Sequence, residues 1–337
     1  MASNLRAAHP MQGMAPRVIP FAIALALTCA AVPVWAQRGT VEGQGGAVAG
    51  PAQPAGLSGS WVAPLTEAAM ERNAGPAIAD WSGMPINEAA RIRGQAYAPG
   101  SLAEPENVCH FYTQWHFADT VYPMGIEPVT GGPTNEILAW KIMPKEDIPP
   151  MTIWMDGNQP PPPSKIADHP RGAYTVGHWE GNMLVAYTTD MKTGMARRNG
   201  LFVSDEATMT SYFIVHSSTQ MTVIYSLHDP LYLTQPYVYS RAYQRVVGGG
   251  NTFSYPPCIP TFNGLAEGQV IYNLPGQNKD LDFMMKNFHI PEYASRGGAQ
   301  TMFPAFRDRL KDQYLKTYST FSKKCTSYCS PTGSDGE

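Results

Sequence analysis

The sequence lacks the motifs that identify several common enzyme classes. It contains no G-x-S-x-G nucleophile elbow, no G-x-G-x-x-G dinucleotide fingerprint and no P-loop for phosphate. The H-x-H and H-E-x-x-H spacings typical of metal-binding histidines are also missing. We therefore predict no cofactor and no metal, and serine-hydrolase chemistry has no support in the sequence.

Charge is scarce, and no basic run occurs. The 337 residues include 24 lysines and arginines and 27 acids, which gives a formal charge of −3. A mildly acidic chain without a basic patch lacks the electrostatic footprint of a nucleic-acid-binding protein. We expect no nucleic-acid partner and no binding to anionic lipid.

The N-terminus has the three parts of a secretory signal peptide. Arg6 and Arg17 precede an apolar run over 18–34, and Ala36 ends a small-residue cleavage site. The run is short and interrupted by prolines, and no other stretch approaches ~18 consecutive apolar residues. We predict cleavage after residue 36 and a periplasmic or secreted mature protein without a membrane span. A lipid anchor on Cys29 is the weaker reading, because Thr28 precedes it.

Four cysteines remain after the signal is removed: Cys109, Cys258, Cys325 and Cys329. An even number of cysteines in an oxidising compartment favours disulfides. Three pairings are possible, of which we favour Cys109 with Cys258 and Cys325 with Cys329. A metal site at the last pair is the alternative, but Cys-x3-Cys without a second ligand pair is a weak zinc signal.

The mature chain is predicted to be one β-rich domain over 57–329. Residues 37–56 are rich in Gly, Ala, Gln and Pro and form a flexible leader, and residues 330–337 form a disordered tail. Frequent Gly and Pro, 31 of each, are typical of short strands joined by turns. The fold class is mainly β, an antiparallel barrel or sandwich with short N-terminal helices. Apolar residues at helical spacing predict a C-terminal helix at about 304–324.

Local patterns place the individual elements. Helices are expected at 64–73 and 85–96, the second with Pro85 at its start. A proline-rich segment, 159–164, should be an exposed polyproline II stretch. Alternating apolar and polar residues predict strands at 107–117, 135–143, 151–156, 173–179, 183–189, 209–216, 220–227 and 236–246.

The predicted strand at 107–117 carries the favoured catalytic candidates. Alternation puts His110, Tyr112 and His116 on one face and Trp115 on the other. His110 and His116 would lie about 20 Å apart, so one metal ion would not bridge them. Histidine titrates near neutral pH and suits acid or base catalysis. The alternative is a strand face in contact with solvent.

Further polar residues lie at predicted turns and serve as candidates for substrate binding beside Trp115. His178 and Glu180 flank a hairpin tip, where they could orient one another for proton transfer. Asp156 precedes a glycine, and Asp229 precedes a proline at a strand end. Turns expose polar residues by default, so each of these positions has an equally simple structural explanation.

Several segments resemble a large bacterial family of uncharacterised exported proteins. Residues 153–157, 177–185 and 188–189 resemble the family pattern "IYMDGR … GxWEGDTLVVDTTGF", and residues 57–61 resemble "DLSGVW". The chain departs from the pattern at Asn158, Asn182, Tyr187 and Asp190. The resemblance covers about 57–246 and implies homology without implying an activity. Val203-Ser204 stands where a His-Ser pair is expected, and Asp229-Pro230 falls on a late-strand pattern. The Gly59-x-Trp61 opening also resembles lipocalin-type barrels.

Two functions follow as hypotheses. The favoured one is an exported enzyme that performs acid/base chemistry of the lyase, isomerase or hydrolase type on an aromatic or apolar substrate. The alternative is a non-catalytic periplasmic binding or carrier protein for a small apolar ligand. An envelope structural protein is a third possibility. In the first two hypotheses the partner is a small molecule, and the sequence does not indicate an oligomeric state.

Overall fold

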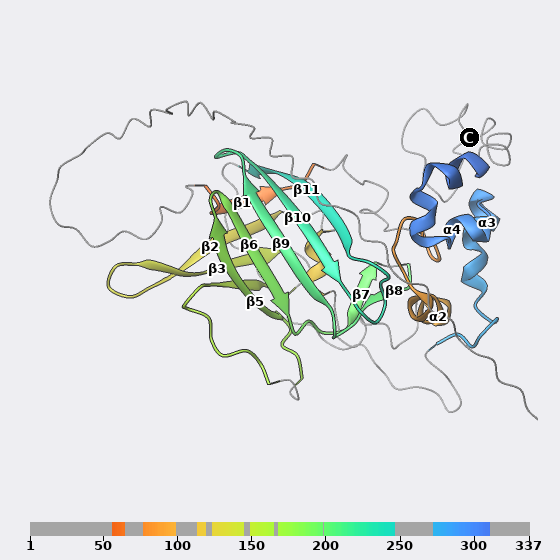
Figure 1. Ribbon diagram of the computed structural model, residues 1–337, viewed down its shortest axis with the longest axis horizontal. Coiled ribbons are helices and arrows are strands. Elements are labelled where there is room, and N and C mark those ends of the chain that lie inside the picture. The colour runs from red at the N-terminus through yellow and green to blue at the C-terminus, as the bar shows by residue number, and fades with distance from the viewer. Residues whose placement is uncertain are drawn as a thin grey trace, which may run out of the picture. The chain divides into compact units, whose positions relative to one another are not determined.

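The structure, a computed structural model, describes residues 56–64, 77–98, 113–118, 123–144, 149–164, 168–197, 199–246 and 272–310. All of them belong to the unit Pro51–Glu337. Within these ranges nine strands close into a β-barrel in the order β1-β11-β10-β9-β6-β5-β4-β3-β2 (Figure 1). The bounds are β1 Gly59–Val62, β2 Met124–Gly131, β3 Glu136–Pro144, β4 Met151–Met155, β5 Tyr174–Glu180, β6 Met183–Thr189, β9 Thr208–Val215, β10 Gln220–His228 and β11 Tyr237–Val246. The predicted mainly β fold is confirmed.

One parallel pair departs from the purely antiparallel prediction. In a closed ring with an odd number of strands, not every neighbouring pair can be antiparallel. In this ring of nine, β4 and β5 are the neighbours that run parallel. A parallel pair needs a crossover connection rather than a tight turn. The connection between these two strands includes the predicted segment 159–164, which has no regular secondary structure and is largely exposed.

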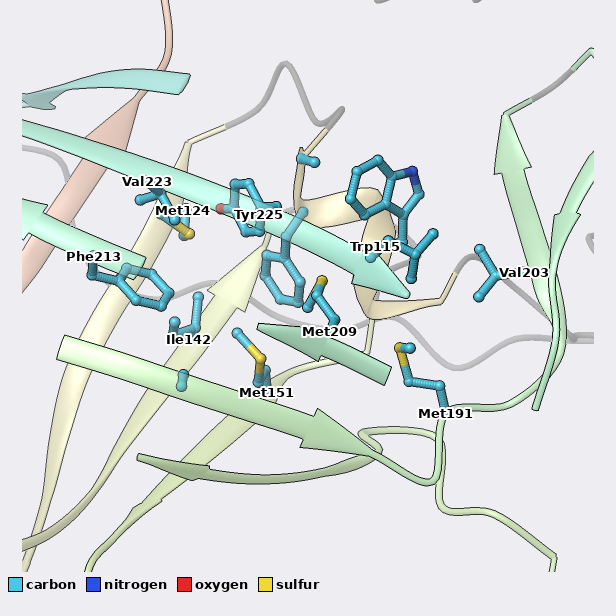
Figure 2. Close-up of a cluster of buried hydrophobic side chains, with 14 of the residues drawn as sticks. Trp115, Met124, Ile142, Met151, Met191, Val203, Met209, Phe213, Val223 and Tyr225 are labelled. Atoms are coloured by element: carbon cyan, nitrogen blue, oxygen red, sulfur yellow. The ribbon is translucent and has the colours of Figure 1, made fainter. Parts of the chain in front are cut away.

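Side chains fill the inside of the barrel (Figure 2). Paired strands share their inward positions, so Phe213 on β9 lies opposite Val223 on β10 and Leu184 on β6. A water-sized hollow beside a side chain would leave part of the surface of that side chain accessible. Many inward side chains have no accessible surface: Met151, Ile153, Leu184, Met209, Phe213, Val223 and Tyr225 are all 0% exposed. These buried positions form a hydrophobic core inside the described barrel.

The segment at residue 115 contradicts the predicted strand over 107–117. Residues 107–112 lie outside the described part of the chain, and Gln114–Ala118 form the 3₁₀ helix η1. The His116 amide donates to the Thr113 carbonyl at 2.9 Å, which is the helical i→i+3 bond. Trp115 and Phe117 are both buried, but so are their neighbours Gln114 and Ala118, so burial does not alternate. The apolar residues here pack from a helical turn against β10, β11 and β7.

The remaining elements accompany the barrel. Strands β7 (Gly194–Arg197) and β8 (Leu201–Val203) form a two-stranded sheet, and the helix α2 (Glu88–Ala96) contacts β8. Asn87 caps α2 by accepting from the Ala90 amide at 3.1 Å. The C-terminal elements are η2 Lys279–Asp282, α3 Phe283–Phe288, α4 Glu292–Ser295 and η3 Gly298–Met302. Residues 304–310 are helical, as predicted, and 311–324 lie outside the described residues.

Most predicted elements that fall in the described ranges are confirmed. The seven strands predicted beyond residue 130 correspond to β3, β4, β5, β6, β9, β10 and β11, and the second predicted helix corresponds to α2. The helix predicted at 64–73 has only its first residue inside the described part. Strands β1, β2, β7 and β8 are additional. Pro128 hides the strand pattern of β2 in the sequence. In the structure β1 pairs with β2 only at residues 124–126, so the missing amide of Pro128 costs no hydrogen bond between these two strands.

Gly177 gives a direct test of the packed interior. A Cβ at this position would lie 2.5 Å from Ile153 Cγ2 and 3.1 Å from the Val185 carbonyl oxygen. We predict that Gly177→Ala lowers the free energy of unfolding by about 1–3 kcal/mol, because overpacking a filled core forces side chains off their rotamers. Chemical denaturation measures this loss. In an Ile153→Ala background the same change should cost clearly less, and equal costs in both backgrounds would contradict the packing described.

Candidate functional site

A cavity of about 380 Å³, open to solvent on one side, lies between the turn at residues 80–82 and the C-terminal helices. Its lining is mainly apolar: Met284, Ile290, Ala294, Met302, Phe306 and Leu310. The polar lining residues are Asp80, Ser82, Ser295, Thr301 and Arg307. Small-molecule sites typically measure about 300–1,000 Å³ and combine an apolar wall with a few polar groups. This cavity has that size and composition.

Main-chain hydrogen bonds hold the two walls of the cavity together. The Trp81 amide donates to the Ser295 carbonyl at 2.7 Å. The Gly83 amide donates to the Gly298 carbonyl at 3.0 Å and also to Thr301 Oγ1 at 2.8 Å. Gly83 has a φ of +75°, which a residue with a side chain rarely adopts. The turn therefore meets α4 and η3 through backbone contacts that do not depend on a bound molecule.

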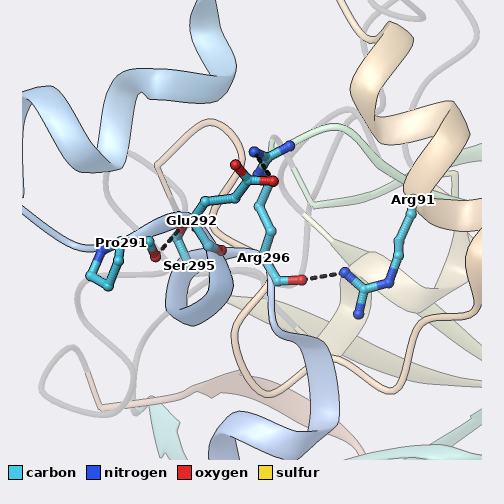
Figure 3. A network of polar contacts seen from close by, with 5 residues as sticks. All are labelled: Arg91, Pro291, Glu292, Ser295 and Arg296. Atoms are coloured by element: carbon cyan, nitrogen blue, oxygen red, sulfur yellow. Dashed lines mark hydrogen bonds and ion pairs between the residues drawn. The ribbon is translucent and has the colours of Figure 1, made fainter. Parts of the chain in front are cut away.

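Arginine side chains fix α4 from a second direction (Figure 3). Arg91 on α2 donates to the carbonyl of Arg296 and, at 3.2 Å, to that of Gly297. The Arg296 guanidinium pairs with Glu292 Oε1 at 2.5 Å, four residues earlier. The Arg91 donors thereby satisfy carbonyls just beyond the C-terminal end of α4. The cavity wall is thus preorganised.

Of the three residues predicted for catalysis, His116 alone lies in the described part of the chain. His110 and Tyr112 lie outside the described residues. His116 is partly buried in η1, and Trp115 is completely buried, with its ring centroid 4.9 Å from that of Tyr237. Trp115, predicted to bind substrate, therefore contributes to the hydrophobic core between η1 and β11.

The hairpin residues lie on the surface. His178 Nε2 and Glu180 Oε1 are 2.9 Å apart, so the predicted mutual orientation occurs. Their side chains are 46% and 57% exposed, and Gly181 at the tip has a φ of +62°. Asp156 occupies an exposed turn after β4, and its amide donates to the Gly177 carbonyl at 3.1 Å. None of these residues lines the cavity.

Asp229 is buried and fully engaged in hydrogen bonds. Its carboxylate accepts from Ser204 Oγ and from the Ser204 amide, each at 2.8 Å. It also accepts from the amides of Leu231 at 3.0 Å and Tyr232 at 3.2 Å. The two positions singled out by the family resemblance, Ser204 and Asp229, therefore meet. Since four donors surround a carboxylate that is 1% exposed, its role is to hold the turn after β10 against the residue that follows β8.

Two tyrosines form a polar pair inside the barrel. The Tyr243 hydroxyl donates to the Phe117 carbonyl at 3.3 Å, so Tyr225 donates the 3.2 Å bond between the two hydroxyls. Burial raises the pKa of Tyr225 well above its ordinary value, and the neighbouring Tyr243 raises it further. Arg241 lowers the same pKa by a smaller amount. Tyr225 is therefore a neutral hydrogen-bond donor that links the barrel to η1.

The described residues contain no group of three or more His, Cys, Asp or Glu side chains placed to hold a metal ion. The four cysteines predicted to form disulfides, Cys109, Cys258, Cys325 and Cys329, all lie outside the described part of the chain. Among the described helices, none is long and apolar enough to span a membrane.

Sequence reasoning missed the cavity. Its walls come from residues that are about two hundred positions apart in the chain, and no local pattern joins Asp80 to Met302. The available signal was the helical spacing of Phe306 and Leu310, which predicted the C-terminal helix. Both residues line this cavity, and Phe306 is buried.

Comparison of the chain with family models, with curated proteins and with solved structures finds no match. The function therefore has to be inferred from the site itself.

Replacing Asp229 tests its structural role. Asp229→Asn keeps the shape of the side chain but replaces one acceptor oxygen with an NH₂ group, which faces the hydrogen-bond donors around residue 229. We predict a loss of roughly 3 kcal/mol in the free energy of unfolding, because a buried charged acceptor is removed and its donors lose their partner. Asp156→Asn, in an exposed turn, is the matched control and should change stability by less than about 0.5 kcal/mol. Equal stability of both variants in urea denaturation would show that the contacts of Asp229 are unimportant.

The raised pKa of Tyr225 predicts how stability depends on alkaline pH. Above about pH 10 a tyrosine in the unfolded chain loses its proton, whereas buried Tyr225 in the folded protein keeps its proton. Unfolding therefore releases a proton, and the free energy of unfolding falls as pH rises. Wild-type protein should therefore lose stability more steeply above about pH 10 than Tyr225→Phe. Tyr187→Phe, at a position that is 45% exposed, should keep the wild-type slope. Identical slopes for all three proteins would contradict the prediction.

Proposed function

We propose that this protein binds a small, mostly apolar molecule in the cavity between the turn at 80–82 and the C-terminal helices. The observation that carries the proposal is the cavity itself, with about 380 Å³ of volume and six apolar side chains in its wall. The alternative predicted from the sequence, a non-catalytic binding or carrier protein, thus becomes the preferred function.

The geometry of the polar groups supports binding without turnover. An acid/base enzyme needs a titratable side chain within hydrogen-bond reach of the substrate. Among the described lining residues Asp80 is the one acid, Arg307 is a permanent cation that cannot accept a proton, and there is no histidine. The predicted pair His178 and Glu180 lies on the exposed hairpin instead. Catalysis by His110, Tyr112 and His116 stays a prediction, since two of the three lie outside the described residues.

The cellular setting of this function comes from the sequence alone. The N-terminal signal at 1–36 leads us to place the binding protein in the periplasm or outside the cell. The proposed partner is a soluble small molecule, in keeping with the absence of a basic run for nucleic acid.

Binding of the neutral fluorescent probe N-phenyl-1-naphthylamine tests the proposal. We expect saturable binding to the mature protein, weakened at least tenfold by Ala294→Trp, because the indole would occupy the cavity beside α4. Ala242→Trp makes the same substitution at an exposed position on β11 and should leave the affinity unchanged. The probe should be recovered with its mass unaltered.

A second variant guards against misfolding. Met302 is 67% exposed and lines the cavity, so Met302→Asp should fold normally while it places a charge in the apolar wall. Thermal melts of each variant report whether the fold is intact. Unchanged probe affinity in both folded cavity variants, or no saturable binding to wild type, would refute the proposed function.

A further inference from the structure

Four of the five polar lining residues already have partners inside the protein. Ser82 Oγ donates to Asp80 Oδ1 at 2.7 Å, and the Ser82 amide donates to the same oxygen at 3.2 Å. Thr301 Oγ1 donates to the Gly298 carbonyl at 2.9 Å. Ser295 Oγ lies 3.4 Å from two carbonyls of its own helical turn. The hydroxyls are therefore used to build the cavity wall, and little hydrogen-bonding capacity remains there for a ligand.

Arg307 is the exception. Within the part of the chain that the structure describes, its guanidinium has no hydrogen bond or ion pair. Its backbone amide donates to the Phe303 carbonyl at 3.2 Å, which places the residue on the helix at 304–310. Leu310, one turn further along, also lines the cavity. Neighbouring Arg309 differs, since its guanidinium stacks on the Phe306 ring at 5.1 Å.

We propose that Arg307 recognises an anionic group, so that the ligand is an amphiphile with an apolar body and one carboxylate end. This inference rests on the proposed function, because it names the chemical class that the same cavity takes. The planar guanidinium presents five donors and pairs with a carboxylate through two parallel hydrogen bonds. The apolar body would lie against Met284, Ile290 and Phe306. Asp80, the opposite charge in the lining, disfavours a second anionic group on the ligand.

Three competitors with one naphthalene body separate the possibilities. They are 1-naphthoate, the neutral 1-naphthalenemethanol and the cationic 1-naphthylmethylammonium, each used to displace N-phenyl-1-naphthylamine. We expect naphthoate to bind about threefold more tightly than the neutral alcohol at low salt, the size expected for an ion pair at an exposed arginine. The ammonium compound should bind most weakly.

Charge-removing variants connect this preference to one side chain. Arg307→Gln should abolish the advantage of naphthoate over the alcohol, measured as the ratio of their two affinities for the same variant. Lys141→Gln removes the same charge from an exposed position on β3 and should preserve the advantage. Because both positions are exposed, neither variant should impair folding.

The outcomes are distinguishable. If the neutral probe binds but naphthoate has no advantage, or keeps its advantage in Arg307→Gln, the role of Arg307 is refuted while the cavity remains a binding site. Tighter binding of the ammonium compound would likewise overturn the anionic class and point to Asp80. If the neutral probe does not bind at all, the proposed function itself fails.

Discussion

The filled interior of the barrel is the constraint on which the remaining structure depends. Inward side chains such as Phe213, Val223 and Met209 have no accessible surface, and a substitution as small as Gly177→Ala would place a Cβ 2.5 Å from Ile153. A barrel of this size has an interior just wide enough for side chains to fill. The described interior of the barrel is therefore packed, and we propose that binding occurs where other elements meet. The cavity among the C-terminal helices is such a place.

Buried polar groups connect the barrel to its surroundings rather than to a substrate. Asp229 gathers four donors at the end of β10, and Tyr225 reaches η1 through Tyr243. Burial of an unpaired polar group is costly, so such networks fix one arrangement of the packed segments. From the sequence, titratable side chains at predicted turns were candidates for substrate binding or proton transfer. In the structure, buried Asp229 satisfies backbone amides, and exposed His178 pairs with Glu180.

Much of the fold could be predicted from the sequence because burial in most strands follows the side-chain alternation. In β9 and β10 the buried and less buried positions alternate without interruption, which is the pattern that identified them. The prediction was wrong at 114–117, where apolar residues two apart also fit a 3₁₀ turn buried on several sides. The candidate site could not be predicted, since its wall joins the turn at 80–82 to residues between 284 and 310. Only tertiary packing brings these segments together.

The location of the bound molecule is the central claim, and methionine methyl NMR tests it most directly. The chain has 17 methionines, of which Met284 and Met302 line the cavity and Met151 and Met209 lie inside the barrel. In protein labelled with ¹³C at the methionine methyl groups, titration with N-phenyl-1-naphthylamine should shift the Met284 and Met302 signals along one saturable curve. The Met151 and Met209 signals should stay in place. Shifts confined to the barrel methionines would contradict the account.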